Sequence, residues 1–369
     1  MSTATSLPSP ALTVSNGRSA TLAVPSVPSP VPLSPSFQFA TDKPADEALP
    51  WTQSFSMHEM ALLHHWTRHA SRSIAGSSSA DELWQGIFPR VAFQHTFVMS
   101  ALLSLSALHL AHLHERHRRY YLIEAARHNQ NAITGLRHGL ANLTPEISDG
   151  VFACTTLNSV YIFVAAGPLG DDAPEHGSPA SVNHRTLGAD WITHLRGVAV
   201  VLRPVHEHVM RGPLAPLMRY GNWDTIEPDS EAGPDDAILL DLKSAWSDET
   251  TTEVYDEALY FLRRCSIFMK DWDGQASKCT PEYGYNGPWS GPFIWLHCVP
   301  PQFLVKIDQR QPHALLIFAH FGAILHSLDE HWVMSGWGRR IVSVIYELLG
   351  SYWDAWLRWP RKVVGLEQP

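Results

Sequence analysis

The sequence predicts an all-α protein, with a single large helical domain preceded by a disordered tail rich in proline and serine. Apolar residues recur at helical spacing over long segments that begin near Trp51. No segment alternates polar and apolar residues for long enough to indicate a β-strand. The 369 residues are 45% hydrophobic and 17% charged, and this composition allows a large buried core.

The first 50 residues form the predicted tail. They hold nine of the 27 prolines, together with many serines and threonines. A segment of this composition cannot bury enough apolar area to offset the entropy that ordering costs. We therefore expect a disordered tail or linker at residues 1–50, a helical domain at residues 51–362 and a C-terminal tail at residues 363–369.

Helical periodicity predicts successive helices in the first half of the domain, at residues 55–75, 97–113, 120–143, 145–163 and 189–205. In the first of these, Phe55, Met60 and Trp66 should share a buried face. The second is apolar over about 17 residues, which is typical of a buried core helix. Thr144 and Pro145 are the residue types preferred at an N-cap and at the first helical position.

The second half of the domain is also predicted to be helical. Glycine and proline mark exposed loops at residues 167–181 and 278–292, and an acidic patch covers residues 224–236. Helices are expected outside these two loops and the acidic patch, at residues 246–272 and within residues 293–357.

Charge and cysteine usage exclude several classes of protein. The formal net charge is -9 and the pI is about 6.1, so the basic surface of a stand-alone nucleic-acid binder is missing. The four cysteines, Cys154, Cys265, Cys279 and Cys298, are too widely spaced for a zinc or disulfide framework and indicate a reducing compartment. No uninterrupted apolar run of about 18 residues is present, so no membrane contact is expected.

Two histidine clusters are candidate metal ligands. They comprise His64, His65 and His69, and then His109, His112, His114 and His117. Imidazoles one helical turn apart can share a metal, but a site also needs a third ligand of fixed geometry, and the nearby carboxylates do not complete a recognised spacing. Solvated or hydrogen-bonded histidines are the favoured interpretation, and neither a metal nor a cofactor is expected.

A class I terpene cyclase is the alternative function, because that enzyme class is also all-α and holds magnesium on two acidic motifs. The corresponding residues are Asp171, Asp172 and Glu175, and then Asp248, Thr252 and Asp256. The first motif lies among glycines and prolines rather than on a rigid helix, which is a poor setting for octahedral magnesium. No catalytic residue is therefore predicted, and we expect the protein not to be an enzyme.

The sequence does not support nucleophilic catalysis either. The sequence has no GxSxG elbow, and Cys154 falls on an apolar helix face, where a buried and unreactive thiol is the usual case.

The aromatic residues near the C-terminus have two interpretations. Large apolar residues usually fill a core. The same residues can also line a pocket for a sterol-like ligand between helices. The candidate ligand-binding residues in that second interpretation are Phe318, Phe321, Leu325, Trp332, Met334 and Trp337.

Several segments together resemble the regulatory domain of fungal binuclear-zinc-cluster transcription factors of the sterol uptake control type. They are an early helix with Met57 and His58, the runs FVMSALLSLSALHLA, YYLIEAARHNQNAITGL and DWITHLRGV, and the C-terminal stretch that ends in Trp359 and Pro360. The resemblance implies a helical domain that follows a zinc-cluster DNA-binding module and binds a hydrophobic, sterol-like ligand. It also implies a homodimer, or a heterodimer with a zinc-cluster regulator. The implied location is the nucleus, with the cytoplasm for an inactive form.

One feature of that family is missing from these residues. A binuclear zinc cluster needs six closely spaced cysteines, and none precedes Cys154. No direct DNA binding is expected from this chain alone. We therefore expect a transcriptional regulator or co-regulator of a fungal metabolic or sterol-related pathway that acts through its helical domain. A truncated gene model is an open alternative.

Overall fold

The computed structural model describes residues 54–75, 82–172, 179–231, 235–249, 252–270 and 287–367. Residues 55–369 belong to one compact unit. Within the described ranges the chain forms helices joined by turns and contains no strand, which confirms the all-α prediction. The predicted tail at residues 1–50 lies outside the described residues.

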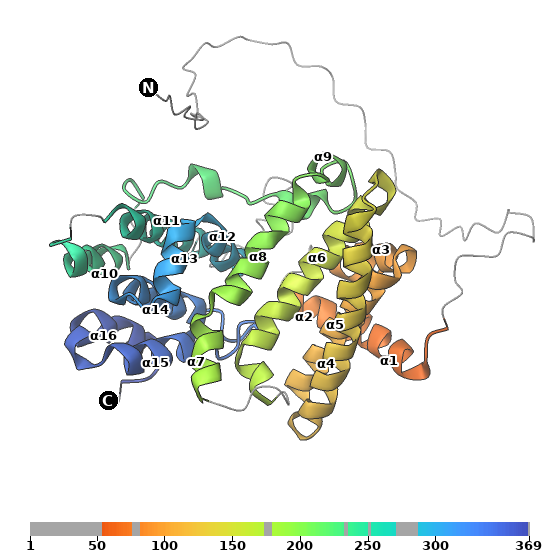
Figure 1. Cartoon of the computed structure of the whole chain (residues 1–369), viewed down its shortest axis with the longest axis horizontal. Helices are drawn as coiled ribbons and strands as arrows, with labels where there is room; N and C mark the ends of the chain where they lie inside the picture. The colour runs from red at the N-terminus through yellow and green to blue at the C-terminus, as the bar shows by residue number, and fades with distance from the viewer. Residues whose placement is uncertain are drawn as a thin grey trace, which may run out of the picture. The chain divides into compact units, whose positions relative to one another are not determined.

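The first half of the fold is a group of helices packed around α4. Its helices are α1 Met57–His65, α2 Ser71–Ala75, α3 Phe88–Gln94, α4 Thr96–Leu113, α5 Arg118–Ala141, α6 Pro145–Ala166, α7 Pro179–Leu187 and α8 Ala189–Leu202 (Figure 1). Two π-helical segments, Trp66–Ala70 and Glu82–Ile87, lie between α1 and α3.

Helix α4 is the core of this group, as its apolar sequence predicts. It packs against α1, α3, α5 and α6. By length and composition, α4 and α6 could each cross a membrane, but 72% and 61% of their apolar windows are buried inside the fold. Burial against neighbouring helices explains their apolar composition without a membrane.

The start of α1 is fixed by a capping box. The Glu59 carboxylate accepts a hydrogen bond from the Ser56 backbone N–H at 2.8 Å, and the Ser56 hydroxyl accepts one from the Glu59 backbone N–H at 3.2 Å. The predicted buried face of this helix is only partly right, because Trp66 is buried whereas Phe55 and Met60 are 43% and 53% exposed. Phe55 precedes the Ser56 N-cap and so lies outside the helix, and Met60 lies about 200° around α1 from the buried Leu62.

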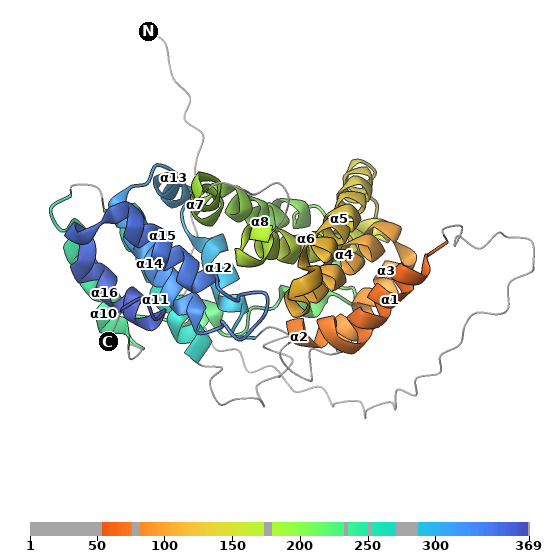
Figure 2. The same ribbon diagram turned by 90° about the horizontal axis from the view of Figure 1, so that it is seen from below.

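The second half of the fold contains the remaining helices. They are α9 His206–Val209, α10 Asp236–Asp241, α11 Glu253–Lys270, α12 Ser290–Cys298, α13 Pro301–Asp308, α14 Pro312–His326, α15 Trp337–Leu349 and α16 Asp354–Val363. Figure 1 and Figure 2 both show α8 between the α1–α6 group and the α10–α16 group.

Helix α14 is the core of the second half. Its residues from Ala314 to Leu325 are all buried, and it packs against α11, α15 and α16. The approach of α15 is unusually close, because a Cβ atom added to Gly338 would lie 2.5 Å from the carbonyl oxygen of Gly322. Glycine at this crossing therefore allows the two backbones to meet.

Helix boundaries in the second half differ from the predictions in three places. Trp246 lies in a short 3₁₀ turn, and α11 begins only at Glu253. Helix α12 begins at Ser290, inside the predicted glycine and proline loop. Helix α16 continues through Pro360 to Val363 instead of ending at the proline. Pro360 falls near the C-terminal end of a ten-residue helix, where few backbone hydrogen bonds remain for it to disrupt.

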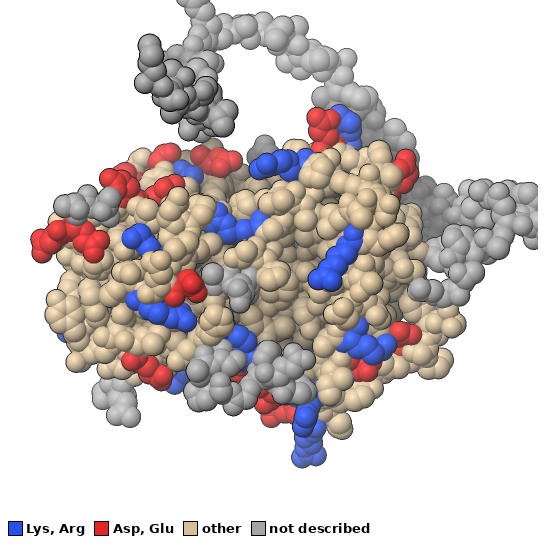
Figure 3. Space-filling model, viewed as in Figure 1, with Lys and Arg blue, Asp and Glu red and all other residues tan. Residues whose placement is uncertain are grey.

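The acidic patch at residues 224–236 has a structural explanation. Arg263 of α11 is 4% exposed and donates to Asp236 from Nε at 2.6 Å and to Asp229 from Nη1 at 2.6 Å. Lys270 pairs with Asp235 at 2.7 Å. The patch therefore docks on α11 through ion pairs. Figure 3 shows acidic and basic side chains interspersed on the viewed face, without a continuous basic stripe.

Candidate functional site

All six residues predicted to bind a ligand are buried. Phe318, Phe321 and Leu325 of α14 are 0% exposed, and the other three are at most 6% exposed. The Phe318 and Phe321 rings are nearly parallel with centroids 5.4 Å apart, and the Trp295 ring stacks on Phe321 at 4.4 Å. This part of the predicted site is a packed aromatic stack.

The two predicted tryptophans lie in different environments. Trp332 contacts His109 and His112 of α4, with ring centroids 5.1 Å and 6.1 Å away. Trp337 stacks on Phe163 of α6 at 4.9 Å. The structure therefore brings Phe318 and Phe321 together but distributes the tryptophans to other contacts, and the ligand-binding role of the six residues stays a prediction.

Trp337 joins three helices that are distant in sequence. Its indole Nε1 donates to the Phe163 carbonyl oxygen at 3.2 Å, and its ring lies 5.1 Å from the Trp191 ring of α8. A Cβ atom added to Gly167 would lie 2.4 Å from Trp337 Nε1, so glycine is needed for this approach. We call Phe163, Gly167, Trp191 and Trp337 the Trp337 junction, and it links α6 and α8 to the start of α15.

The aspartates of the first cyclase-like motif are engaged by arginines. Asp171 Oδ1 accepts from Arg185 Nη2 of α7 at 2.6 Å and from Arg340 Nη2 of α15 at 2.7 Å. Asp172 Oδ2 accepts from Arg118 Nη1 of α5 at 2.9 Å. Glu175 lies outside the described residues. These carboxylates are ion-pair partners that tie the end of α6 to three other helices, an arrangement that does not favour magnesium binding.

The second cyclase-like motif is also occupied by protein contacts. Asp256 accepts hydrogen bonds from the Thr252 hydroxyl at 2.8 Å and from Trp246 Nε1 at 3.3 Å. Asp248 precedes α11 and is exposed, so the motif does not project from one helix face. Nothing in the described part of the chain supports the terpene cyclase alternative.

Histidines from the two predicted clusters meet in space. His65 Nε2 lies 2.8 Å from His109 Nδ1, and the His69 ring lies 5.3 Å from the His65 ring. Burial lowers the pKa of His65 to about 4 and the pKa of His109 to about 3. Both imidazoles are therefore neutral at pH 7 and can share one N–H. The described residues contain no group of three or more metal-ligating side chains arranged to hold an ion.

Buried thiols offer no reactive nucleophile. Burial raises the pKa of Cys154 to about 12 and also raises the pKa values of Cys265 and Cys298. A protonated thiol is a poor nucleophile at neutral pH. Cys279 lies outside the described residues.

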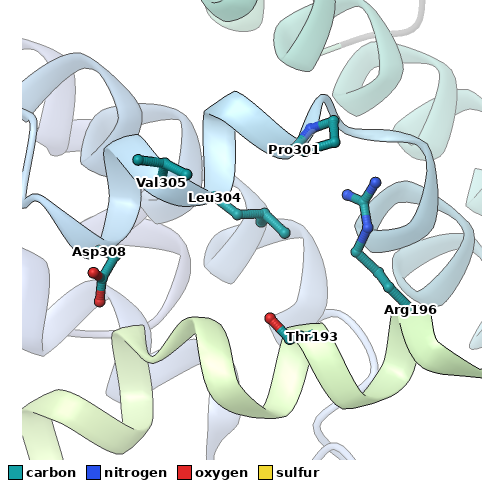
Figure 4. Close-up of a pocket in the computed structure, with 6 residues that line it drawn as sticks. All are labelled: Thr193, Arg196, Pro301, Leu304, Val305 and Asp308. Carbon is teal, nitrogen blue, oxygen red and sulfur yellow. The ribbon is translucent and has the colours of Figure 1, made fainter.

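A pocket lies elsewhere, between α8 and α13. Its volume is about 330 Å³, and its lining residues are Thr193, Arg196, Pro301, Leu304, Val305 and Asp308 (Figure 4). Thr193 and Arg196 lie in the DWITHLRGV segment, but the spacing of that segment does not indicate a pocket, so the sequence did not reveal it. The sequence offers only a weak indication of this pocket, namely the apolar residues Pro301, Leu304 and Val305 on one helix.

Comparison with known proteins relates part of the chain to a known family. Residues 61–218 match the model of the fungal-specific transcription factor domain. The match spans helices from α1 to α9, and confirms the resemblance predicted from the sequence.

Similar proteins extend the relationship beyond this segment. A Zn(2)-C6 fungal-type transcription factor of Gibberella zeae is 25% identical over 337 residues, which cover 84% of this chain and 62% of that protein. Sterol uptake control protein 2 of Candida albicans is 26% identical over 154 residues, which are 41% of this chain and 20% of that protein. Sterol uptake control protein 2 of Saccharomyces cerevisiae is 26% identical over 214 residues, or 56% and 21% of the respective chains. The aligned part of the chain spans less than two thirds of each relative.

The helices after residue 218 pack directly on the segment that matches the family model. α8 contacts α12 and α13, and α7 contacts α15. The Trp337 junction and the Asp171 ion pairs reinforce these contacts. The matched segment and the C-terminal helices are therefore physically continuous, although the family model covers only the first of them.

Proposed function

We propose that the chain is the regulatory part of a fungal transcriptional regulator, acting on a sterol-related or other metabolic pathway, including secondary metabolism. The observation that carries the proposal is the match of residues 61–218 to the transcription factor domain, supported by relatives named as transcription factors and sterol uptake control proteins. The nucleus is the proposed site of action, and an inactive form would stay in the cytoplasm. The family match favours regulation over catalysis.

The proposed mechanism is a shift between two arrangements of the C-terminal helices. A sterol-like ligand, or a protein partner, binds one arrangement more tightly and so raises its population. The six predicted ligand-binding residues are at most 6% exposed, so a ligand must replace existing packing around α14 to reach them. A site that opens only in a minor conformation would bind its ligand by selecting that conformation.

The Trp337 junction provides a route for coupling the two halves. Trp337 of α15 and Arg340 of the same helix contact α6 and the turn that follows it, at Phe163 and Asp171. Movement of α15 would therefore disturb α6, which packs on the core helix α4. Interdigitated aromatic packing resists continuous deformation, which favours two discrete states.

The proposed protein partner is a zinc-cluster regulator, bound as a heterodimer, or a second copy of the chain. In that case sequence-specific DNA contacts come from zinc-cluster modules rather than from the residues shown here, which contain no set of six spaced cysteines.

The proposal is tested by binding measurements on the purified chain. We expect saturable binding of a fluorescent sterol, detected as energy transfer from tryptophan, or co-purification of a zinc-cluster protein identified by mass spectrometry. Phe321→Trp should weaken sterol binding by filling the predicted site, whereas Tyr352→Trp, at a side chain that is 79% exposed, should leave it unchanged. Absence of both sterol binding and a zinc-cluster partner would contradict the proposal.

A further inference from the structure

The pocket between α8 and α13 forms a short open groove with an apolar floor. Pro301, Leu304 and Val305 of α13 form one wall, and Thr193 and Arg196 of α8 form the other. Figure 4 shows Thr193 opposite Leu304 near the middle of the groove. The groove is separate from the packed aromatic stack on α14.

The two ends of the groove carry opposite charges. Figure 4 shows Arg196 at the Pro301 end and Asp308 at the other end of α13. Arg196 is held in place, because its Nη1 donates to the Val299 carbonyl at 2.6 Å and to the Leu296 carbonyl at 3.4 Å. A guanidinium oriented in this way loses little freedom when it binds a carboxylate. Asp308 is exposed and accepts no hydrogen bond from a described residue.

Apolar surface around the groove remains uncovered. Val305 of α13 is 53% exposed, and Val200, one turn beyond Arg196 on α8, is 70% exposed. On the same helix, a Cβ atom added to Gly197 would meet nothing within 4 Å. Exposed apolar side chains beside open space, with a charged side chain at each end of the groove, are features of a surface that receives a partner segment.

We propose that this groove docks an amphipathic helix of a partner protein, with an acidic residue toward Arg196 and a basic residue toward Asp308. The eight residues from Pro301 to Asp308 are separated by seven steps, which span about 10 Å at the rise of an α-helix. A partner helix along the groove therefore places its acid and base at positions i and i+7. An apolar residue at i+3 or i+4 then fills the space above Leu304.

The two charges determine which end of the partner helix lies at Arg196. An acidic residue in its first turn and a basic residue in its last turn would also complement its own helix dipole. The inference goes beyond the proposed transcriptional role, because the groove can bind a helix whether or not a sterol binds at α14. Sterol binding at α14 and peptide binding in the groove can therefore be gained or lost independently of each other.

The test uses two helical peptides of identical composition. The forward peptide carries Glu, Leu and Lys at i, i+3 and i+7. The scrambled peptide exchanges Leu and Lys, so its charges are too close together to reach both ends of the groove in either direction. We expect the full chain to bind the forward peptide about tenfold more tightly in fluorescence anisotropy titrations at low salt. Asp308→Lys should remove most of this preference, because it replaces the attraction at one end by repulsion without disturbing a buried residue.

A matched pair of variants separates docking from loss of folding. Val305→Asp should abolish binding of the forward peptide, whereas Leu348→Asp, on α15 and 45% exposed, should not change it. Equal binding of the two peptides, or binding that Val305→Asp leaves intact, would overturn the proposal. Binding of decanoate but of neither peptide, or self-association that Val305→Asp abolishes, would also overturn it by assigning the groove to a small amphiphile or to a second copy.

Discussion

Replacing Trp337 by alanine tests whether the junction joins the two halves of the fold. The side chain is 1% exposed, stacks on the Phe163 ring at 4.9 Å and donates to the Phe163 carbonyl at 3.2 Å. Truncating a buried aromatic residue to alanine typically costs about 3–5 kcal/mol of unfolding free energy, through lost transfer energy and the remaining cavity. Because Trp337 contacts both α6 and α8, we expect a loss near the upper end of this range.

Urea unfolding followed by far-ultraviolet circular dichroism measures the loss. Trp356→Ala is the matched control, because that indole is half-buried and bonds to the exposed Ser244 hydroxyl at 3.0 Å. The control should lose about 1 kcal/mol. Trp337→Phe should lose an intermediate amount, about 2 kcal/mol, because it keeps a stacked ring but removes the N–H donor and part of the buried indole. Equal losses for Trp337→Ala and Trp356→Ala would refute the structural role of the junction.

Three further predictions address the core. Arg263→Ala should lower the unfolding free energy by about 3–5 kcal/mol, because Asp236 is only 6% exposed and would lose its buried partner. The double variant Arg263→Met with Asp236→Leu should have an unfolding free energy near that of the wild type. Equal losses for the single and double variants in urea unfolding would contradict this prediction. Burial lowers the pKa of His320 from 6.5 to about 4. As the pH falls, the unfolded chain therefore binds this proton before the folded chain does. The contribution of His320 to the unfolding free energy should be complete above pH 6.5 and decrease toward pH 4. His320→Phe should flatten this dependence in melting experiments across that range, and an unchanged slope would argue against it. Gly338→Ala should cost about 1–3 kcal/mol by pushing α15 away from a carbonyl of α14, whereas Gly197→Ala, which faces open space, should be neutral or stabilising in thermal unfolding.

Helical periodicity predicts the elements best where one face or the whole helix is buried. The apolar run of α4 and the amphipathic pattern of α5 are both found where the sequence places them. The same reasoning fails at Phe55, which precedes the start of α1, and at Met60, which lies on the opposite face of α1 from the buried Leu62. It also misses the start of α12 at Ser290, where tertiary packing overrides the preference of glycine and proline for loops.

Site residues were harder to predict because their roles depend on contacts between distant segments. The sequence could not show that Asp171 meets Arg340 from a helix 169 residues away, or that His65 meets His109. It correctly indicated that the late aromatic residues matter for the fold, since Phe318 and Trp337 are buried. Whether the same residues also receive a ligand depends on conformations that periodicity does not encode.

The most direct test of the regulatory role is a reporter assay in yeast. The chain is fused to a heterologous DNA-binding domain, and reporter transcription is measured before and after sterol depletion, with a Trp337→Ala fusion as the comparison. The account predicts a several-fold, sterol-dependent change that the variant loses while its protein level is maintained. Transcription that stays at the level of the DNA-binding domain alone under both conditions would contradict it.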